Sequence, residues 1–183
     1  MLLMSVLCWV AANASAQGRY TVEKASVVYV DNSGSTLSLS FADFGSRIRL
    51  ELGTGGAVIV TDELSVYLDT NTKTYYALDK VTADNYLTMF DCQSSVAGFH
   101  TPDTDLYYNM ETRTRTVAGV ECTVWTWLEG DAAAECSYGG AYGILFVERT
   151  AGNSTLEAVS YSTEVYDDAF AVPDDYTQIT LAY

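Results

Sequence analysis

The chain has 183 residues, with 24 acidic against 9 basic side chains and a net charge of −15 at pH 7. This charge argues against a nucleic-acid-binding protein, because a phosphate backbone is bound by a concentrated basic surface. The single histidine, His100, excludes a multi-histidine metal centre and disfavours a catalytic triad. Apolar residues make up 49% of the chain, which indicates a folded core rather than a disordered chain.

The N-terminus has the pattern of an export signal. An apolar run, Met1–Trp9, is followed by small residues, and Ala14 and Ala16 match an A-x-A cleavage site. A bilayer span needs about twenty apolar residues, so neither this run nor any later stretch predicts a transmembrane segment. We expect residues 1–16 to be a signal peptide and 17–183 to form a single β-rich domain. The expected location is the periplasm or cell envelope of a Gram-negative bacterium.

Period-two alternation of apolar and polar residues is the dominant signal, and it is typical of half-buried β-strands. Turn-forming residues separate the strands at intervals of roughly ten residues, as in an antiparallel meander. The continuous apolar run at 142–149 suits a strand that is covered on both faces. The strand-like stretches are 37–41, 48–52, 64–68, 113–117, 120–129, 142–149 and 156–166.

One segment has helical spacing. Thr82 can cap a short helix in which Tyr86, Met89 and Phe90 share a face. The connection that follows, at 91–109, is long for a compact domain, and we interpret it as either a functional flap or a misread helix.

The cysteines outside the signal peptide are Cys92, Cys122 and Cys136. Cys8 follows Leu7 rather than the small residue that precedes a lipidated cysteine, so it is assigned to the discarded segment. In an oxidising compartment, one disulfide and one buried free thiol form the simplest arrangement. The preferred pair is Cys122–Cys136, because their segments look like the arms of a hairpin, and Cys92–Cys122 is the alternative.

Short motifs carry a family resemblance in order along the chain. They are the strand and turn at 64–76, the Val-Ala-Gly-Val-Glu-Cys opening at 117–122, and the F-x-x-P-x-x-Y element that closes at Tyr176. Together they resemble small secreted proteins related to the Lol-type periplasmic lipoprotein carriers. The resemblance implies a mainly β fold, in which a single strongly curved antiparallel sheet forms an unclosed β-barrel with one or two short helices. In the carriers the concave face holds acyl chains under a helical lid, whereas this chain has little helical pattern.

Aromatic side chains in the strand-like segments are the candidate ligand-binding residues. Flat amphipathic rings on a half-open sheet suit an acyl chain, a sterol or a glycan, and ordinary cross-strand packing is the alternative interpretation. Trp125 and Trp127 are the leading candidates, since alternation places both on one face. The predicted set is Trp125, Trp127, Tyr75, Tyr76, Tyr142 and Tyr161.

We therefore expect an exported binding protein that holds an apolar or amphipathic ligand on the concave face of a half-barrel. Its partner would be a lipid, an acyl chain or an acylated protein. The alternative is a cell-envelope interaction protein without a small-molecule ligand, which works through sheet edges or an exposed aromatic patch. A third possibility, a carboxylate-based hydrolase, requires two carboxylates that face each other in a cleft, and no spacing demands them.

No cofactor, metal site or catalytic residue is predicted. His100 lies near Asp103 and Asp105, but a calcium site needs about six or more oxygens, so a solvated loop is the favoured interpretation. Arginines at alternate strand positions suit an anion clamp, although pairing with neighbouring acids is the commoner arrangement. They are Arg47 with Arg49, and Arg113 with Arg115.

Overall fold

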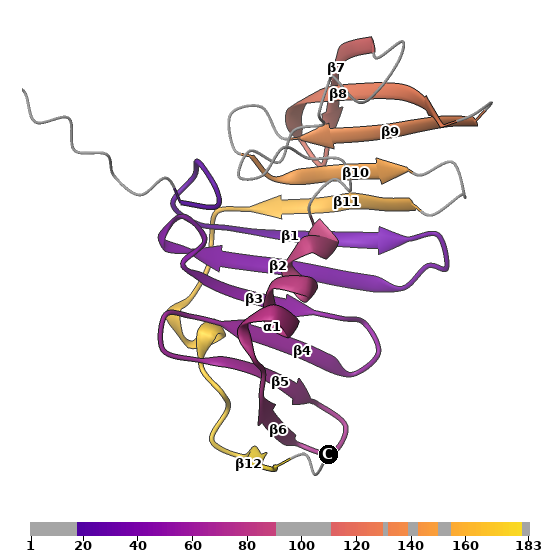
Figure 1. Ribbon diagram of the computed structural model, residues 1–183. Helices are drawn as coiled ribbons and strands as arrows, with labels where there is room; N and C mark the ends of the chain where they lie inside the picture. The colour runs from indigo at the N-terminus through magenta and orange to yellow at the C-terminus, as the bar shows by residue number, and fades with distance from the viewer. Residues whose placement is uncertain (1–17, 91–110, 130–131, 139–142, 150–154, 181–183) are drawn as a thin grey trace, which may run out of the picture.

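The computed structural model describes residues 18–90, 111–129, 132–138, 143–149 and 155–180, with the backbone alone for 128–129, 132–138 and 149. All strands formed by the described residues belong to one sheet (Figure 1). They are β1 (Ala25–Asp31), β2 (Thr36–Ala42), β3 (Arg47–Glu51), β4 (Gly56–Val60), β5 (Ser65–Asp69), β6 (Thr74–Ala77), β7 (Glu111–Val117), β8 (Val120–Glu129), β9 (Ala132–Tyr138), β10 (Leu145–Arg149), β11 (Thr155–Ser162) and β12 (Thr177–Gln178).

Within the described ranges the sheet has 12 strands, in the order β12-β6-β5-β4-β3-β2-β1-β11-β10-β9-β8-β7. Two meanders therefore join side by side, where β1 pairs with β11. Every pairing is antiparallel except that of β12 with β6. The sheet is open, with β12 and β7 at its two edges, so the predicted fold class, a mainly β protein with one unclosed antiparallel sheet, is confirmed.

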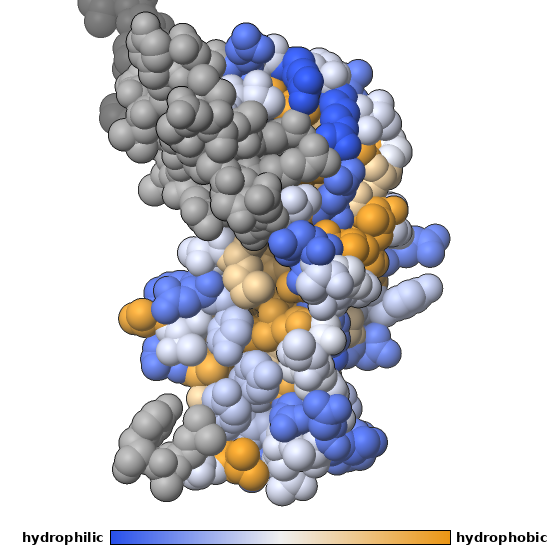
Figure 2. Space-filling model, turned by 90° about the vertical axis from the view of Figure 1, so that its right-hand side faces the viewer, coloured by the Kyte–Doolittle hydropathy of each residue, from blue (hydrophilic) through white to orange (hydrophobic). Residues whose placement is uncertain are grey.

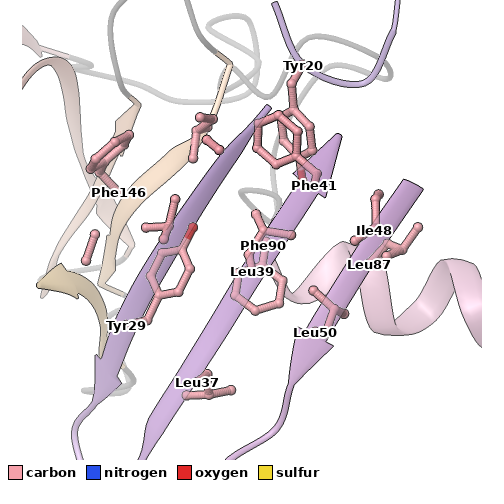
Figure 3. Packing of buried hydrophobic residues seen from close by; sticks show 14 of the residues in the cluster. Tyr20, Tyr29, Leu37, Leu39, Phe41, Ile48, Leu50, Leu87, Phe90 and Phe146 are labelled. Atoms are coloured by element: carbon pink, nitrogen blue, oxygen red, sulfur yellow. The ribbon is translucent and has the colours of Figure 1, made fainter. Parts of the chain in front are cut away.

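Alternation along the strands sets the two faces of the sheet. In β3, Ile48 and Leu50 are buried on the face that carries the helix, called the front face here, while Arg47, Arg49 and Glu51 point to the back face. Figure 3 shows these front-face side chains packing against those of β1 and β2. A shift of one residue would exchange the two sets, so this pattern fixes the register.

The sheet curls strongly at the β7 end. Arg115 of β7 forms an ion pair with Glu157 of β11, with Nη2 and Oε1 2.9 Å apart. Three strands lie between β7 and β11 in the sheet order. A flat sheet would separate the two strands by about 19 Å, which is beyond the combined reach of these side chains. The predicted strong curvature is therefore present in this half of the sheet.

A short helix covers the front face of the first meander. Helix α1 (Lys80–Leu87) continues into the 3-10 turn η2 (Thr88–Phe90). The predicted cap was wrong: Asp79 caps the helix, and its carboxylate accepts the backbone N–H of Thr82 at 2.8 Å. The predicted face was wrong in part, because the tighter 3-10 turn leaves Met89 43% exposed while Phe90 is buried.

The only α-helix in the described ranges has eight residues, whereas a bilayer-spanning helix needs about twenty. No described helix could therefore cross a membrane.

Loss of the helix cap gives a first test of this local structure. We expect Asp79→Ala to lower the free energy of unfolding by about 1 kcal/mol, because the Thr82 N–H loses its acceptor. Asp84→Ala removes an exposed partner of Lys80 on the same helix and is expected to cost less than about 0.5 kcal/mol. Urea denaturation measures both values, and equal losses would contradict the role of the cap.

The main core joins the two meanders. The Tyr29 hydroxyl of β1 reaches across β11 and donates to the Leu145 carbonyl of β10 at 2.9 Å, and the Tyr29 ring lies 5.0 Å from that of Phe90. Burial raises the pKa of Tyr29 well above its ordinary value. Residues 144–147 are all almost fully buried, so the predicted strand at 142–149 is covered on both faces at these four positions, although β10 begins only at Leu145.

A C-terminal strap, residues 163–180, covers the back face of β3–β6 (Figure 1, yellow). It contains the 3-10 turn η4 (Asp167–Phe170) and β12. Val172 and Tyr176 of the strap pack on a second apolar cluster formed by β4 and β5. Arg49 donates to the Ala169 carbonyl at 3.1 Å, and Lys73 forms an ion pair with Asp175. The F-x-x-P-x-x-Y element is thus the sequence of this strap.

Candidate functional site

The tyrosines predicted to bind a ligand lie in different places. Tyr75 and Tyr76 are neighbours on β6 and therefore point to opposite faces. Tyr75 belongs to the cluster under the strap on the back face. Tyr76 lies on the front face and stacks on Tyr67, with ring centroids 5.3 Å apart. Tyr161 packs against Phe146 at 5.8 Å in the other half of the sheet.

The two tryptophans share one face of β8, as alternation predicts. They alternate with the buried Cys122 and Val124. Trp127 is only 5% exposed, and Trp125 is half-buried. Trp127 and Val124 are thus buried on opposite faces of one strand. Tyr142 lies outside the described residues, and ligand binding by this set stays a prediction.

The predicted Cys122–Cys136 disulfide is wrong. Cys122 is a free, buried thiol, whose Sγ donates to the Val120 carbonyl at 3.4 Å. The hairpin of β8 and β9 is present, but its register places Cys136 opposite Trp125, three residues from Cys122. Three residues correspond to about 10 Å along a strand, and a disulfide requires Cα atoms within about 7 Å. Cys92, the alternative partner, lies outside the described residues.

Burial disfavours the reactive thiolate form of Cys122. Desolvation raises its pKa from 9.0 to about 11, although Arg115 nearby acts in the opposite direction. We expect iodoacetamide to modify Cys122 slowly in the native protein at pH 8 and rapidly in urea. Because the folded pKa is raised, the stabilising contribution of the protonated thiol is complete below pH 9 and is lost as the pH rises towards 11. Peptide mapping reports the modification, and rapid native labelling would contradict the burial.

The front face carries a group of half-buried tyrosines beside α1. Tyr67 of β5 lies between Tyr76 and the helix residue Tyr86, whose ring centroid is 6.0 Å away. Burial, and then the neighbouring Tyr86, raise the pKa of Tyr67. Gly56 on β4 makes room for its hydroxyl, since a Cβ there would lie 2.2 Å from the Tyr67 oxygen. Leu87 and Phe90 pack into the front-face core next to this group.

A groove opens on the back face instead. Its volume is about 510 Å³, and it lies between the 3-10 turn η1 (Asp43–Gly45), the start of β3, the turn between β4 and β5, and the strap. Leu64, Phe170 and Ala171 form its apolar wall. Its charged lining residues are Asp43, Arg47, Asp62, Glu63 and Asp167.

Arg47 is the only cation in the lining of this groove, and it is held on several sides. Its Nε lies 2.6 Å from Asp43 Oδ2, and its Nη1 lies 3.0 Å from Asp167 Oδ1. The guanidinium carbon also lies 5.0 Å from the centre of the Phe170 ring. Hydrogen bonds to the two carboxylates raise the pKa of Arg47. Four carboxylates against one guanidinium leave the lining with a net charge of −3.

Among the described carboxyl groups, those whose pKa clearly moves lie outside this groove. Hydrogen bonds shift the pKa downward for each described carboxyl group whose pKa clearly moves, namely Asp31, Asp69, Asp79 and Asp175. Within the described ranges, no group of three or more His, Cys, Asp or Glu residues is placed to hold a metal ion. His100 and its neighbouring acids lie outside those ranges.

The sequence contained only part of the signal for this groove. Pairing with acids, the commoner arrangement for these arginines, is confirmed for three of them. Arg47 pairs with Asp43 and Asp167, Arg49 pairs with Glu51 at 2.5 Å, and Arg115 pairs with Glu157. However, Asp167 lies 120 residues from Arg47, and no local pattern connects them. Asp62 and Glu63 were not singled out.

Comparison with known proteins supports the fold. A scan against protein-family models finds no match, and a search of curated proteins finds no relative. Among solved structures, MucB matches with a TM-score of 0.51 and 15% identity over 84% of this chain and 58% of its own. An uncharacterized conserved protein of Thermus thermophilus matches with a TM-score of 0.49 and 10% identity, over 85% of this chain and 89% of its own. The likeness to MucB shows a shared fold, and membership of the Lol-type family stays a prediction.

Proposed function

We propose that the chain is an exported, non-enzymatic binding protein of the cell envelope, whose back-face groove receives basic side chains of a partner protein. The observation that carries this proposal is the groove of about 510 Å³ with a lining charge of −3. Its volume lies within the range of about 300–1,000 Å³ that is typical of ligand sites.

The lining favours a cation over an anion. Arg47 already binds Asp43 and Asp167, so two carboxylates balance its charge and an incoming anion gains little attraction from it. Asp62 and Glu63 lie exposed on the turn between β4 and β5 and present charge at the rim. Leu64 offers an apolar wall for the hydrocarbon stem of a lysine or arginine. The net charge of −15 on the whole chain adds long-range attraction for a basic partner.

The test compares two double charge reversals. The probe is a fluorescent peptide of alternating lysine and alanine, and anisotropy at about 50 and about 300 mM salt measures its binding. We expect Asp62→Lys with Glu63→Lys to weaken binding about tenfold. Asp168→Lys with Asp174→Lys changes the net charge equally at exposed positions outside the lining, and we expect less than about a threefold loss. Equal losses would mean that the peptide responds to the overall charge of the protein, and they would overturn the proposal that the groove binds it.

A second candidate is the apolar-ligand role that the resemblance implies. The observation that favours it is the group of half-buried tyrosines at the edge of a front-face core covered by one short helix. Figure 2 also shows hydrophobic atoms at the surface in the middle of the side that carries the turn between β1 and β2. Native mass spectrometry of protein from its own host would support this role if lipid co-purified in near-stoichiometric amount. A clean apo mass after incubation with fatty acids would exclude it.

Export itself has a direct test. Residues 1–16 lie outside the described residues, so the signal peptide rests on its sequence pattern. We expect N-terminal sequencing of protein from the native host to begin at Gln17. A chain that starts at Met1 would remove export, and with it the envelope location, from the proposal.

A further inference from the structure

The two edges of the sheet differ sharply. At one edge, β12 is a two-residue strand that belongs to the strap. At the other edge, β7 is seven residues long and, in the described chain, pairs with β8 alone. Glu111, Thr112, Arg113 and Thr114 are exposed. An edge strand of this length presents a row of backbone N–H and C=O groups to an incoming strand.

We propose that β7 is a docking edge for an extended segment of a partner protein, which adds as a further strand and carries two acidic residues at alternate positions. Backbone hydrogen bonds to β7 would hold the segment, and side-chain pairs would select it. This site is separate from the groove, so the proposal goes beyond the proposed function.

Charge identifies the occupant. Arg113 and Arg115 lie opposite Val124 and Cys122, so the two arginines share one face of the edge strand. They are two of only 9 basic residues in a chain of net charge −15. Residues directly opposite on neighbouring strands pair best when their charges differ. An added strand would therefore carry carboxylates at positions i and i+2, where they face the two arginines.

The ion pair that Arg115 already forms is compatible with this arrangement. Arg115 bonds Glu157 through Nη2 at 2.9 Å, which holds its guanidinium on the inner face of the curl. A guanidinium has five N–H donors and can serve more than one carboxylate. The other face of β7 carries Thr112, Thr114 and Thr116, which suit β-branched neighbours on the added strand.

A second copy of the chain fits this edge poorly. An antiparallel pairing of two β7 strands that uses all seven residues is centred on Thr114 and places Arg113 opposite Arg115 of the other copy. Like charges directly opposite each other are destabilising. Two chains of net charge −15 also repel each other at long range. These features favour a foreign segment over self-association.

The experiment uses matched peptides. Thr-Val-Glu-Val-Glu-Val-Thr presents both acids on one face of a strand, whereas Thr-Val-Glu-Glu-Val-Val-Thr has the same composition with the acids on opposite faces. We expect the first peptide to bind about tenfold more tightly by calorimetry, because only it places both carboxylates against the arginines. Hydrogen exchange of the complex should show increased amide protection at 111–117. A third peptide, N-methylated at alternate residues, should lose binding.

The protein variants complete the test. We expect Arg113→Glu to weaken binding of the first peptide about tenfold, and Lys24→Glu, an exposed charge reversal away from β7, to weaken it less than about twofold. Equal binding of the two isomeric peptides, or unchanged protection at 111–117, would overturn the proposal. If Arg113→Glu fails to fold, Arg113→Ala and the series of peptides still test whether β7 binds the acidic segment. Binding of the lysine–alanine peptide to the groove should change by less than about threefold in these variants.

Discussion

Replacing Phe41 with alanine is expected to lower the free energy of unfolding by about 3–5 kcal/mol. Phe41 lies at the end of β2, is fully buried, and stacks on Tyr20 with ring centroids 4.0 Å apart. It also faces Ala25 of β1 and Ile48 of β3 across the sheet. The truncation would therefore leave a cavity in the layer that joins three strands, and close packing allows only partial collapse around it.

Phe44 provides the matched control for this substitution. It is the same residue type three positions later, but its side chain is 47% exposed. We expect Phe44→Ala to change the free energy of unfolding by less than about 1 kcal/mol, because much of the ring already contacts water. Urea denaturation with an unchanged slope measures both variants. A loss at Phe41 that is no larger than the loss at Phe44 would contradict the packing of this core.

The strands that the sequence predicted best have their apolar residues on one face. β2 and β3 alternate clearly because one face of each meets the front-face core and the other carries polar side chains. β4 was missed for the opposite reason. Its front face lies under α1 and its back face under the strap, so Ala57, Val58 and Ile59 are all buried and no alternation remains. Burial on the back face depends on a segment that is distant in sequence.

The cysteine error has the same kind of cause. The hairpin of β8 and β9 was predicted correctly, but a hairpin alone does not say which residues lie opposite each other. Only two residues separate Glu129 from Ala132, which pair at the end of the hairpin. A loop this short fixes the register, and counting back along it places Cys136 opposite Trp125. The loop length therefore decides against the disulfide.

The candidate sites show which features a local sequence pattern can predict. The alternating arginines of β3 and β7 were visible in the sequence, and both sets became part of a proposed site. What the sequence lacked was their surroundings: the strap carries Asp167 to Arg47 across 120 residues, and the sheet order leaves β7 at an edge. Such neighbours follow from topology, and topology depends on the whole chain.

The final prediction concerns a turn that only glycine can make. Gly53, in the turn between β3 and β4, has φ +70, and a Cβ there would lie 2.4 Å from the Thr36 carbonyl oxygen. Gly34, in the turn between β1 and β2, has φ +83, but a Cβ there would meet nothing within 4 Å. Both substitutions to alanine impose left-handed strain of about 1–2 kcal/mol. Only Gly53→Ala must also move a backbone oxygen at the start of β2.

We therefore expect Gly53→Ala to cost about 3 kcal/mol or more, and Gly34→Ala about 1 kcal/mol. The difference between the two, measured by urea denaturation under the same conditions, isolates the steric part from the conformational part. Similar losses would mean that the turn at Gly53 can move away from Thr36. In that case the close approach of Gly53 to Thr36 would not constrain the start of β2.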